Sequence, residues 1–260
     1  MRHALFVVAF SLGSFAVADD YITIKGQVKW NGTEPPKLVP VRVGPGVLPP
    51  GAPPLFPTDV LVDPKSLGLR NVVVWLRPDT ENRKDAFPPE KIKNELRELK
   101  SIHRVIDTPA LHFEPRVVAA RAGDTLQFIN TSKNIHNINY ESDSETSGGL
   151  LPPAPGGFRL KKPLVVQTTP ISFSCNICPW MSGRLRVFDH PYFALTDKDG
   201  RFEIKDAPVG KWRIVYWHES GFHKGKAGIL GDLIDVKEDM PKTGTMALKP
   251  LAFEIIVPKP

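Results

Sequence analysis

Proline limits the folds open to this chain more than any other residue. The sequence contains 27 prolines in 260 residues, about twice the ordinary usage. Proline interrupts helices and is excluded from the middle of central strands, so many loops and strand edges are expected. Between the prolines, short runs alternate apolar and polar residues, which is the period of a strand. We therefore predict an all-β fold of the sandwich type.

The predicted strands are short alternating or apolar runs bounded by turn residues. They cover residues 21–30, 71–76, 116–120, 125–130, 164–168, 171–175, 184–188, three runs within 193–219, and 252–257. One helix is predicted over residues 88–100. Two prolines suit its first turn, and Ile92, Leu96 and Leu99 fall on one face.

The first eighteen residues have the pattern of a secretory signal. A basic start precedes an apolar run that is too short to span a membrane, and the stretch ends in Ala16-Val17-Ala18. We predict cleavage after Ala18 and a periplasmic or secreted mature protein. A buried N-terminal strand is the alternative. No later stretch is apolar enough to cross a bilayer, and the compartment would allow a disulfide to persist.

The charged residues exclude some functions. The formal net charge is +6, but the basic residues are scattered and carry no interleaved aromatic residues. Nucleic-acid binding is therefore not expected, and only a mild attraction to acidic partners is. The sequence shows no Ser/His/Asp arrangement, paired carboxylates or phosphate-binding loop, so we predict that the protein is not an enzyme.

Residues 175–181, CNICPWM, hold both cysteines of the chain. Thiolate, thioether and imidazole donors together suit copper. Cys175 falls on the apolar face at the end of the predicted strand 171–175. His136 follows strand 125–130 by a few residues, so it can reach a loop at the same end of a sandwich. Met181 lies six residues beyond Cys175.

These segments resemble the cupredoxins. AGDTLQFINTSKNIHN (122–137) is similar to the run that ends in the first histidine ligand of a cupredoxin, and CNICPWM is similar to the Cys-x-x-His-Pro-x-Met loop of amicyanin-like members. The similarity is closest to secreted bacterial proteins called plastocyanin-like or methylamine utilisation proteins, in which a segment like VFDHPYFALTDKDGRFEI (187–204) follows the loop.

The resemblance implies one copper ion with His136, Cys175 and Met181 as ligands. It also implies a one-electron carrier or a copper-handling protein, with a redox protein as partner. Cys178 stands where the family has its second histidine. Two sulfur donors of this kind make the site softer and more negative, which favours Cu(I) or Zn(II) over Cu(II).

The flanking segments resemble a second kind of sandwich. GQVKWNG (26–32), NVVVWL (71–76) and TDKDGRFEIKDAPVGKWRIVYW (196–217) are similar to transthyretin-like or carboxypeptidase-regulatory-like strands. We predict that residues 19–102 and 190–260 form this sandwich and that a cupredoxin-like domain, residues 103–189, is inserted into it. A single larger sandwich is the alternative.

Other interpretations of the cysteines stay open. A Cys175–Cys178 disulfide would leave a metal-free secreted module that binds another protein or a glycan. A subunit of a redox enzyme would need a partner chain. A thioredoxin-like site is less well supported, because Pro179 and a strand follow the cysteines where that motif opens a helix. We predict structural roles for His190 and His218, and a supporting role for Asn137 beside the ligand loops.

Overall fold

The computed structural model describes residues 21–44, 48, 50–108, 111–132, 135–141, 148–150, 155–237 and 244–253. The predicted signal, residues 1–18, lies outside these ranges. Almost every element is a strand, which confirms the predicted all-β class. Among the described residues, no helix has the length and apolar character to cross a membrane.

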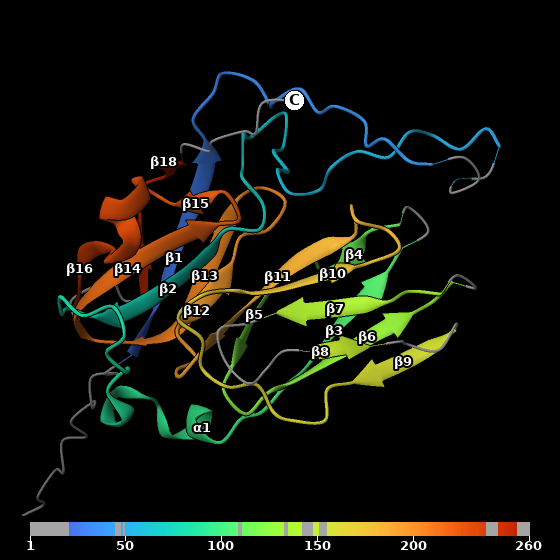
Figure 1. Ribbon diagram of the computed structural model, residues 1–260. Helices are drawn as coiled ribbons and strands as arrows, with labels where there is room; N and C mark the ends of the chain where they lie inside the picture. The colour runs from blue at the N-terminus through green and yellow to red at the C-terminus, as the bar shows by residue number, and fades with distance from the viewer. Residues whose placement is uncertain are drawn as a thin grey trace, which may run out of the picture.

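Two sheets form what we call the first sandwich, on the left in Figure 1. One sheet has the order β13-β1-β17, with β18 also paired to β1, and the other has the order β12-β2-β14-β15, with β16 also paired to β14. Their core is a cluster of fully buried residues that includes Ile24, Leu76 and Phe253. The strands are β1 (Tyr21–Trp30), β2 (Val73–Pro78), β12 (Phe193–Leu195), β13 (Arg201–Pro208), β14 (Gly210–His218), β15 (Gly221–Phe222), β16 (Asp232–Val236), β17 (Thr245–Ala247) and β18 (Leu251–Phe253).

Two further sheets, from one continuous stretch of chain, form the second sandwich, on the right in Figure 1. Their orders are β5-β11-β10-β7-β8 and β4-β3-β6-β9. A separate core that includes Phe128, Phe173 and Leu185 lies between them. The strands are β3 (Ile102–Asp107), β4 (Phe113–Glu114), β5 (Val117–Arg121), β6 (Thr125–Asn130), β7 (Ile138–Glu141), β8 (Gly148–Leu150), β9 (Gly156–Arg159), β10 (Ile171–Cys175) and β11 (Ser182–Phe188).

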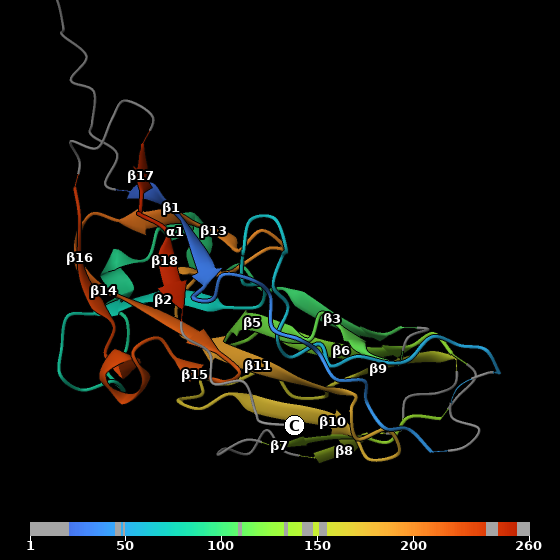
Figure 2. The same ribbon diagram turned by 90° about the horizontal axis from the view of Figure 1, so that it is seen from above.

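The two sandwiches meet along a third apolar cluster. Trp75 of β2 and Trp217 of β14 are buried there together with Val117 of β5 and Phe188 of β11. Figure 2 shows β2 and β14 on one side of this junction and β5 and β11 on the other. The outer face of β11 is therefore covered by protein. The predicted boundaries at residues 103 and 189, and the transthyretin-like character of the first sandwich, stay predictions.

The predicted helix over 88–100 is largely wrong. The structure has a short 3₁₀ turn, Pro89–Lys91, and a single α-helical turn, α1 (Asn94–Arg97). Ile92 between them is extended and buried in the first core, and the Lys93 N–H donates to the Tyr192 hydroxyl. Leu99 is 57% exposed. Tertiary packing of Ile92 breaks the helical period here.

The predicted strand at 164–168 is also wrong. Its backbone groups bond to two different places rather than to one neighbouring strand: Leu164 bonds with Gly123 and Asp124, and the Gln167 N–H bonds to Val187. Val165 and Val166 are exposed. The segment is therefore an extended loop. Its apolar residues do not belong to a strand paired within a sheet.

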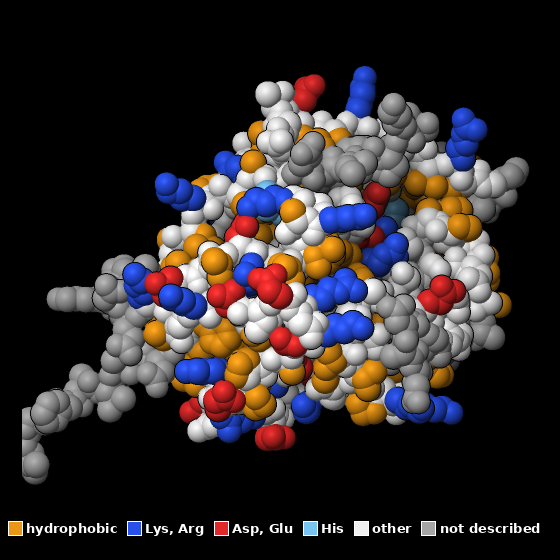
Figure 3. Space-filling view, turned by 60° about the vertical axis from the view of Figure 1, so that its left-hand side comes forward, with side chains coloured by type: hydrophobic (Ala, Val, Ile, Leu, Met, Phe, Trp, Pro, Cys, Tyr) orange, Lys and Arg blue, Asp and Glu red, His pale blue; other side chains and the backbone are white. Residues whose placement is uncertain are grey.

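The surface agrees with the predicted scatter of charge. On the face shown in Figure 3, Lys and Arg side chains are interspersed with acidic and hydrophobic ones.

Candidate metal centre

Two loops at one end of the second sandwich carry the predicted ligands. Residues 131–137 join β6 to β7, and residues 176–181 join β10 to β11. β7 and β10 are antiparallel neighbours, and Cys175 pairs with Ile138 in their register. A further bond from the Asn176 N–H to the Asn137 carbonyl, 2.8 Å, extends this pairing into the loops. His136 and Cys175 therefore meet because their strands are adjacent.

The loop 175–181 closes on itself. The Met181 N–H donates to the Cys178 carbonyl at 2.8 Å, which makes a four-residue turn with Pro179 at its second position, where proline is favoured. The Cys175 N–H donates to the Met181 carbonyl at 2.9 Å. The three sulfur-bearing side chains are directed into the second core as a result. Cys175 and Met181 are fully buried, and Cys178 is 9% exposed.

Three of the four predicted ligands form one cluster. The His136 Nδ1 lies 3.7 Å from the Cys175 Sγ. The donor atoms of His136, Cys175 and Cys178 all lie within 4.8 Å of one another, and the two thiols are not joined. Metal–sulfur and metal–nitrogen bonds of about 2.0–2.3 Å place donors roughly 3.5–4 Å apart around one ion. The cluster therefore has the dimensions of a single-ion site.

The two cysteines have opposite acid strengths. Burial opposes ionisation of Cys175, but His136 and the backbone N–H groups of Cys178, Ile177 and Asn137 outweigh it and lower the pKa of Cys175 to about 7. Burial, followed by the charge of Cys175, raises the pKa of Cys178 to about 11. At neutral pH the metal-free site thus contains one thiol that ionises readily and one that keeps its proton.

A carboxylate orients the imidazole. The His136 Nε2 lies 3.2 Å from the Asp107 Oδ2, and both side chains are almost fully buried. Burial opposes the charge on Asp107, but bonds from the Thr131 N–H and hydroxyl, and then from His136, keep its pKa below the ordinary value. Hydrogen bonding to Cys175 raises the pKa of His136, and Asp107 adds to this effect against burial.

Asp107 is a residue of the candidate site that the sequence did not reveal. It ends β3, 29 residues before His136, and no local spacing connects the two. When His136 is neutral, an Nε2–H donated to this carboxylate leaves the ring lone pair on Nδ1, which faces Cys175. Metal-binding histidines commonly have such a carboxylate partner.

Met181 and Asn137 occupy the predicted neighbourhood. Met181 lies in the same loop and is packed in the second core. Its role as a ligand stays a prediction. Asn137 contributes its carbonyl to Asn176 and its N–H to the Cys175 sulfur. Trp180 is half-buried against the second core, and its indole Nε1 has no hydrogen-bond partner.

The other buried histidines lie elsewhere. His190 accepts a hydrogen bond from the Tyr192 N–H at its Nδ1, and His218 bonds through its Nδ1 to the Ser220 hydroxyl. Within the described ranges, His136, Cys175 and Cys178 are the only group of three or more His, Cys, Asp or Glu residues placed to share an ion.

Exposed hydrophobic residues lie next to the ligands in the chain. Ile135, next to His136, is 65% exposed, and Ile177, between the cysteines, is 57% exposed. Pro179 is exposed in the same loop. Both ligand loops therefore carry exposed apolar side chains beside buried donors.

Comparison with known proteins gives distant likenesses. No protein-family model and no curated protein sequence matches the chain. Among solved structures it is similar to an oxidized amicyanin variant, with 17% identity, 33% of this chain and 81% of the amicyanin covered, and a TM-score of 0.28. It is also similar to a purple cupredoxin from Nitrosopumilus maritimus, with 18% identity, coverage of 33% and 98%, and a TM-score of 0.27.

A third similar structure is a copper-containing nitrite reductase from Thermus scotoductus. The identity is 20%, the match covers 33% of this chain and 22% of the reductase, and the TM-score is 0.26. Scores at this level define neither the ligand set nor the activity.

Proposed function

We propose that the protein is an extracytoplasmic copper-binding protein that holds one Cu(I) ion between His136, Cys175 and Cys178 and passes it to a partner. The observation that supports this most directly is the convergence of one imidazole and two unlinked sulfur atoms within 4.8 Å in a buried site. The protein transforms no substrate under this proposal.

The donor set fits copper in its reduced state. Two cysteine sulfurs and one imidazole are soft or borderline donors, which select Cu(I) and Zn(II), while carboxylate and carbonyl oxygens select harder ions. The single nearby carboxylate, Asp107, is engaged by His136 and Thr131. When bound, copper would supply a soft Lewis acid with an accessible one-electron couple.

Each residue has a distinct role. Cys175, with a pKa of about 7, supplies the first thiolate. Cys178, with a pKa of about 11, has to release its proton when it becomes a ligand. His136 presents Nδ1 because Asp107 holds Nε2. Ile135 and Ile177, each next to a ligand in the chain, are exposed hydrophobic residues, which suits docking of a protein that exchanges the ion.

A competition titration tests the proposal. Protein purified under reducing conditions is titrated with Cu(I) in the presence of a chromophoric Cu(I) chelator, with a free-thiol count before and after. We expect one equivalent bound, loss of binding in Cys175→Ser, and weaker but measurable binding in Cys178→Ser. Because ligands must lose their protons, the apparent affinity should rise about tenfold or more per pH unit between pH 7 and 9. In Cys178→Ser this steep rise should disappear.

A matched pair of methionine variants tests the fourth donor. Met181→Leu conserves volume while removing the thioether, and Met246→Leu in β17 is its control, far from the site in the chain. If Met181 is a ligand, only Met181→Leu lowers the Cu(I) affinity.

The electron-carrier alternative is tested at Cys178. Cys178→His gives two imidazoles and one thiolate, a set that accommodates Cu(II). We expect an intense thiolate-to-Cu(II) absorption band in this variant and a much weaker one in the wild type. Two blocked thiols with no bound copper in the wild type would contradict copper handling and favour the metal-free module.

A further inference from the structure

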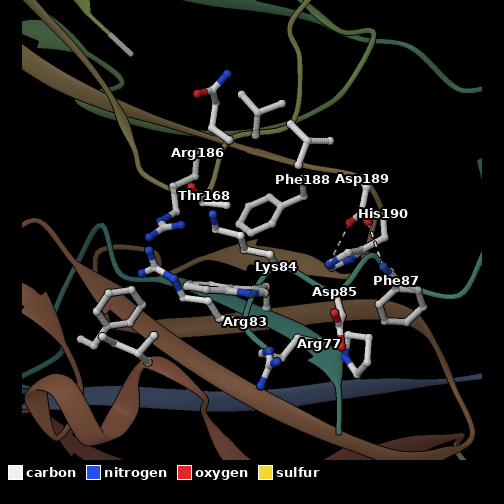
Figure 4. Close-up of a pocket in the computed structure, with 17 residues that line it drawn as sticks. Arg77, Arg83, Lys84, Asp85, Phe87, Thr168, Arg186, Phe188, Asp189 and His190 are labelled. Atoms are coloured by element: carbon white, nitrogen blue, oxygen red, sulfur yellow. Dashed lines mark hydrogen bonds and ion pairs between the residues drawn. The ribbon is translucent and has the colours of Figure 1, made fainter. Parts of the chain in front are cut away.

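A second site lies where the two sandwiches meet. A partly open cavity of about 110 Å³ is lined there by β2, by β11 and by the loops after β2 and before β10. That volume is well above the roughly 10–15 Å³ that a single water needs. Figure 4 shows the side chains around it. None of the candidate metal ligands lines this cavity.

Arg186 of β11 is the unusual residue of this cavity. It is 5% exposed, and its guanidinium carbon lies 4.8 Å from the ring centroids of both Trp75 and Trp217 and 5.6 Å from that of Phe222. Its buried Nε has no hydrogen-bond partner, and no carboxylate among the described residues forms an ion pair with it. A buried guanidinium without a counter-charge is costly, and aromatic faces replace only part of its hydration.

Two further cations face the same space. Arg83 and Lys84 lie on the loop that follows β2, and both line the cavity. In Figure 4 the head groups of Arg83, Lys84 and Arg186 point toward the same end of it, beside Thr168. The charge of Arg83, after the larger effect of burial, contributes to lowering the pKa of Arg186. Like charges are thus brought together rather than kept apart.

Arg77 builds the loop that carries these cations. Its guanidinium donates to the carbonyls of Leu230, Thr80 and Asn82 at 2.9–3.0 Å. A fully engaged arginine therefore fixes the backbone around Arg83 and Lys84. The two cations therefore reach the cavity from a loop that these hydrogen bonds hold in place.

The acids of the cavity lie at its other end. Asp85 accepts a hydrogen bond from the Asn82 amide at 2.7 Å, and Asp189 accepts one from the Phe87 N–H at 2.8 Å. Figure 4 places both beside Phe87 and His190, away from the head group of Arg186. The cationic end is consequently left without a neutralising group from the described chain.

We propose that this end of the cavity binds a small oxyanion, a phosphate or a carboxylate group, between Arg83, Lys84 and Arg186. Guanidinium groups present paired N–H donors that match either oxyanion, and the ammonium of Lys84 adds a point charge. The hydroxyl of Thr168 is a further donor at the cavity wall. This site is separate from the proposed copper site and does not depend on it.

The test uses the full mature chain at constant ionic strength set with chloride. Inorganic phosphate and acetate are titrated in separate arms, which distinguishes the two kinds of oxyanion. Fluorescence reports the binding because Trp75 and Trp217 contact Arg186, and the unfolding midpoint is a second readout. We expect saturable binding in at least one arm.

One pair of substitutions removes positive charge at the proposed site, and a second pair removes it elsewhere on the surface. Arg83→Gln combined with Lys84→Gln changes two exposed residues, so the fold should be kept, and the affinity should fall by about tenfold or more. Arg104→Gln combined with Lys205→Gln removes two exposed charges elsewhere and should leave the affinity unchanged. An equal loss in this control, or no saturable effect of either anion on the wild type, would overturn the proposal and leave Arg186 as a purely aromatic contact.

Discussion

Replacing Asp107 by asparagine separates the stability of the second sandwich from the properties of its sulfur site. The carboxylate accepts bonds from the Thr131 N–H, from the Thr131 hydroxyl at 2.9 Å, and from the His136 Nε2 at 3.2 Å. Asparagine keeps one oxygen acceptor but loses the charge. The choice of ring nitrogen on His136 is then no longer enforced, because an amide can present either its oxygen or its nitrogen to the ring.

The expected effects have separate magnitudes. Hydrogen bonds to a charged group contribute about 1.5–3 kcal/mol each, so Asp107→Asn should lower the free energy of unfolding by roughly 2 kcal/mol. Loss of a carboxylate behind a metal-binding histidine typically lowers metal affinity about 10–100-fold, or roughly 1.4–2.7 kcal/mol. Urea unfolding of the metal-free protein measures the first, and Cu(I) competition measures the second.

Asp124 provides a matched control in the same sandwich. Its carboxylate is also almost fully buried and accepts bonds from the Ser101 and Arg121 N–H groups and from the His103 Nε2 at 2.8 Å. Asp124→Asn should destabilise the protein by a similar amount and leave Cu(I) affinity unchanged. If both variants lower the affinity equally, or neither does, Asp107 does not orient a metal ligand.

Three further predictions concern the frame around the sites. Burial lowers the pKa of His190 to about 3, so the contribution of the neutral side chain to stability is complete above its ordinary pKa near 6.5 and is lost as the pH falls. The free energy of unfolding should therefore decrease by about 2 kcal/mol between pH 8 and pH 5. Urea unfolding of His190→Asn should show a shallower pH dependence, and an unchanged slope would refute the assignment. A methyl group on Gly183 would lie 2.3 Å from both the Arg116 carbonyl oxygen and the Phe173 ring, so Gly183→Ala should lower the free energy of unfolding by about 1–3 kcal/mol, measured by thermal unfolding. Gly149→Ala, whose methyl group would meet no neighbour, is the control in this assay. Arg116→Met should destabilise by about 3–5 kcal/mol because it removes the short ion pair of the buried Glu219 and leaves only Arg184, 3.9 Å away, as a partner among the described residues. Glu219→Gln in the Arg116→Met background should recover part of this loss, and a double-mutant cycle without coupling would contradict the ion pair.

The sequence predicted the sulfur site better than its surroundings. Alternation placed Cys175 on the inner face of its strand, and the position of His136 just after β6 placed it at the same end of the sandwich. Both predictions depend on local patterns that a strand imposes directly. Whether the residues bind copper is a separate matter, which the titrations decide.

Residues that act through distant contacts were missed. Asp107 has no pattern that connects it to His136, since the contact exists only because β3 and β6 are parallel neighbours in a sheet. The helix prediction failed because Ile92 packs into the first core. Alternation also made Arg186 an ordinary outward residue of β11. The alternation of apolar and polar residues indicates which way a side chain faces, but it does not show that another sandwich covers that face.

The covered face of β11 has a practical consequence for dissecting this protein. Cutting the chain near residues 103 and 189 would give two pieces. In one, Trp75 and Trp217 would lose the residues that cover them. In the other, Arg116 would lose its partner Glu219. Each fragment would present a freshly opened apolar surface, which favours aggregation. The intact chain, rather than a trimmed second sandwich, is therefore the material on which metal binding should be measured.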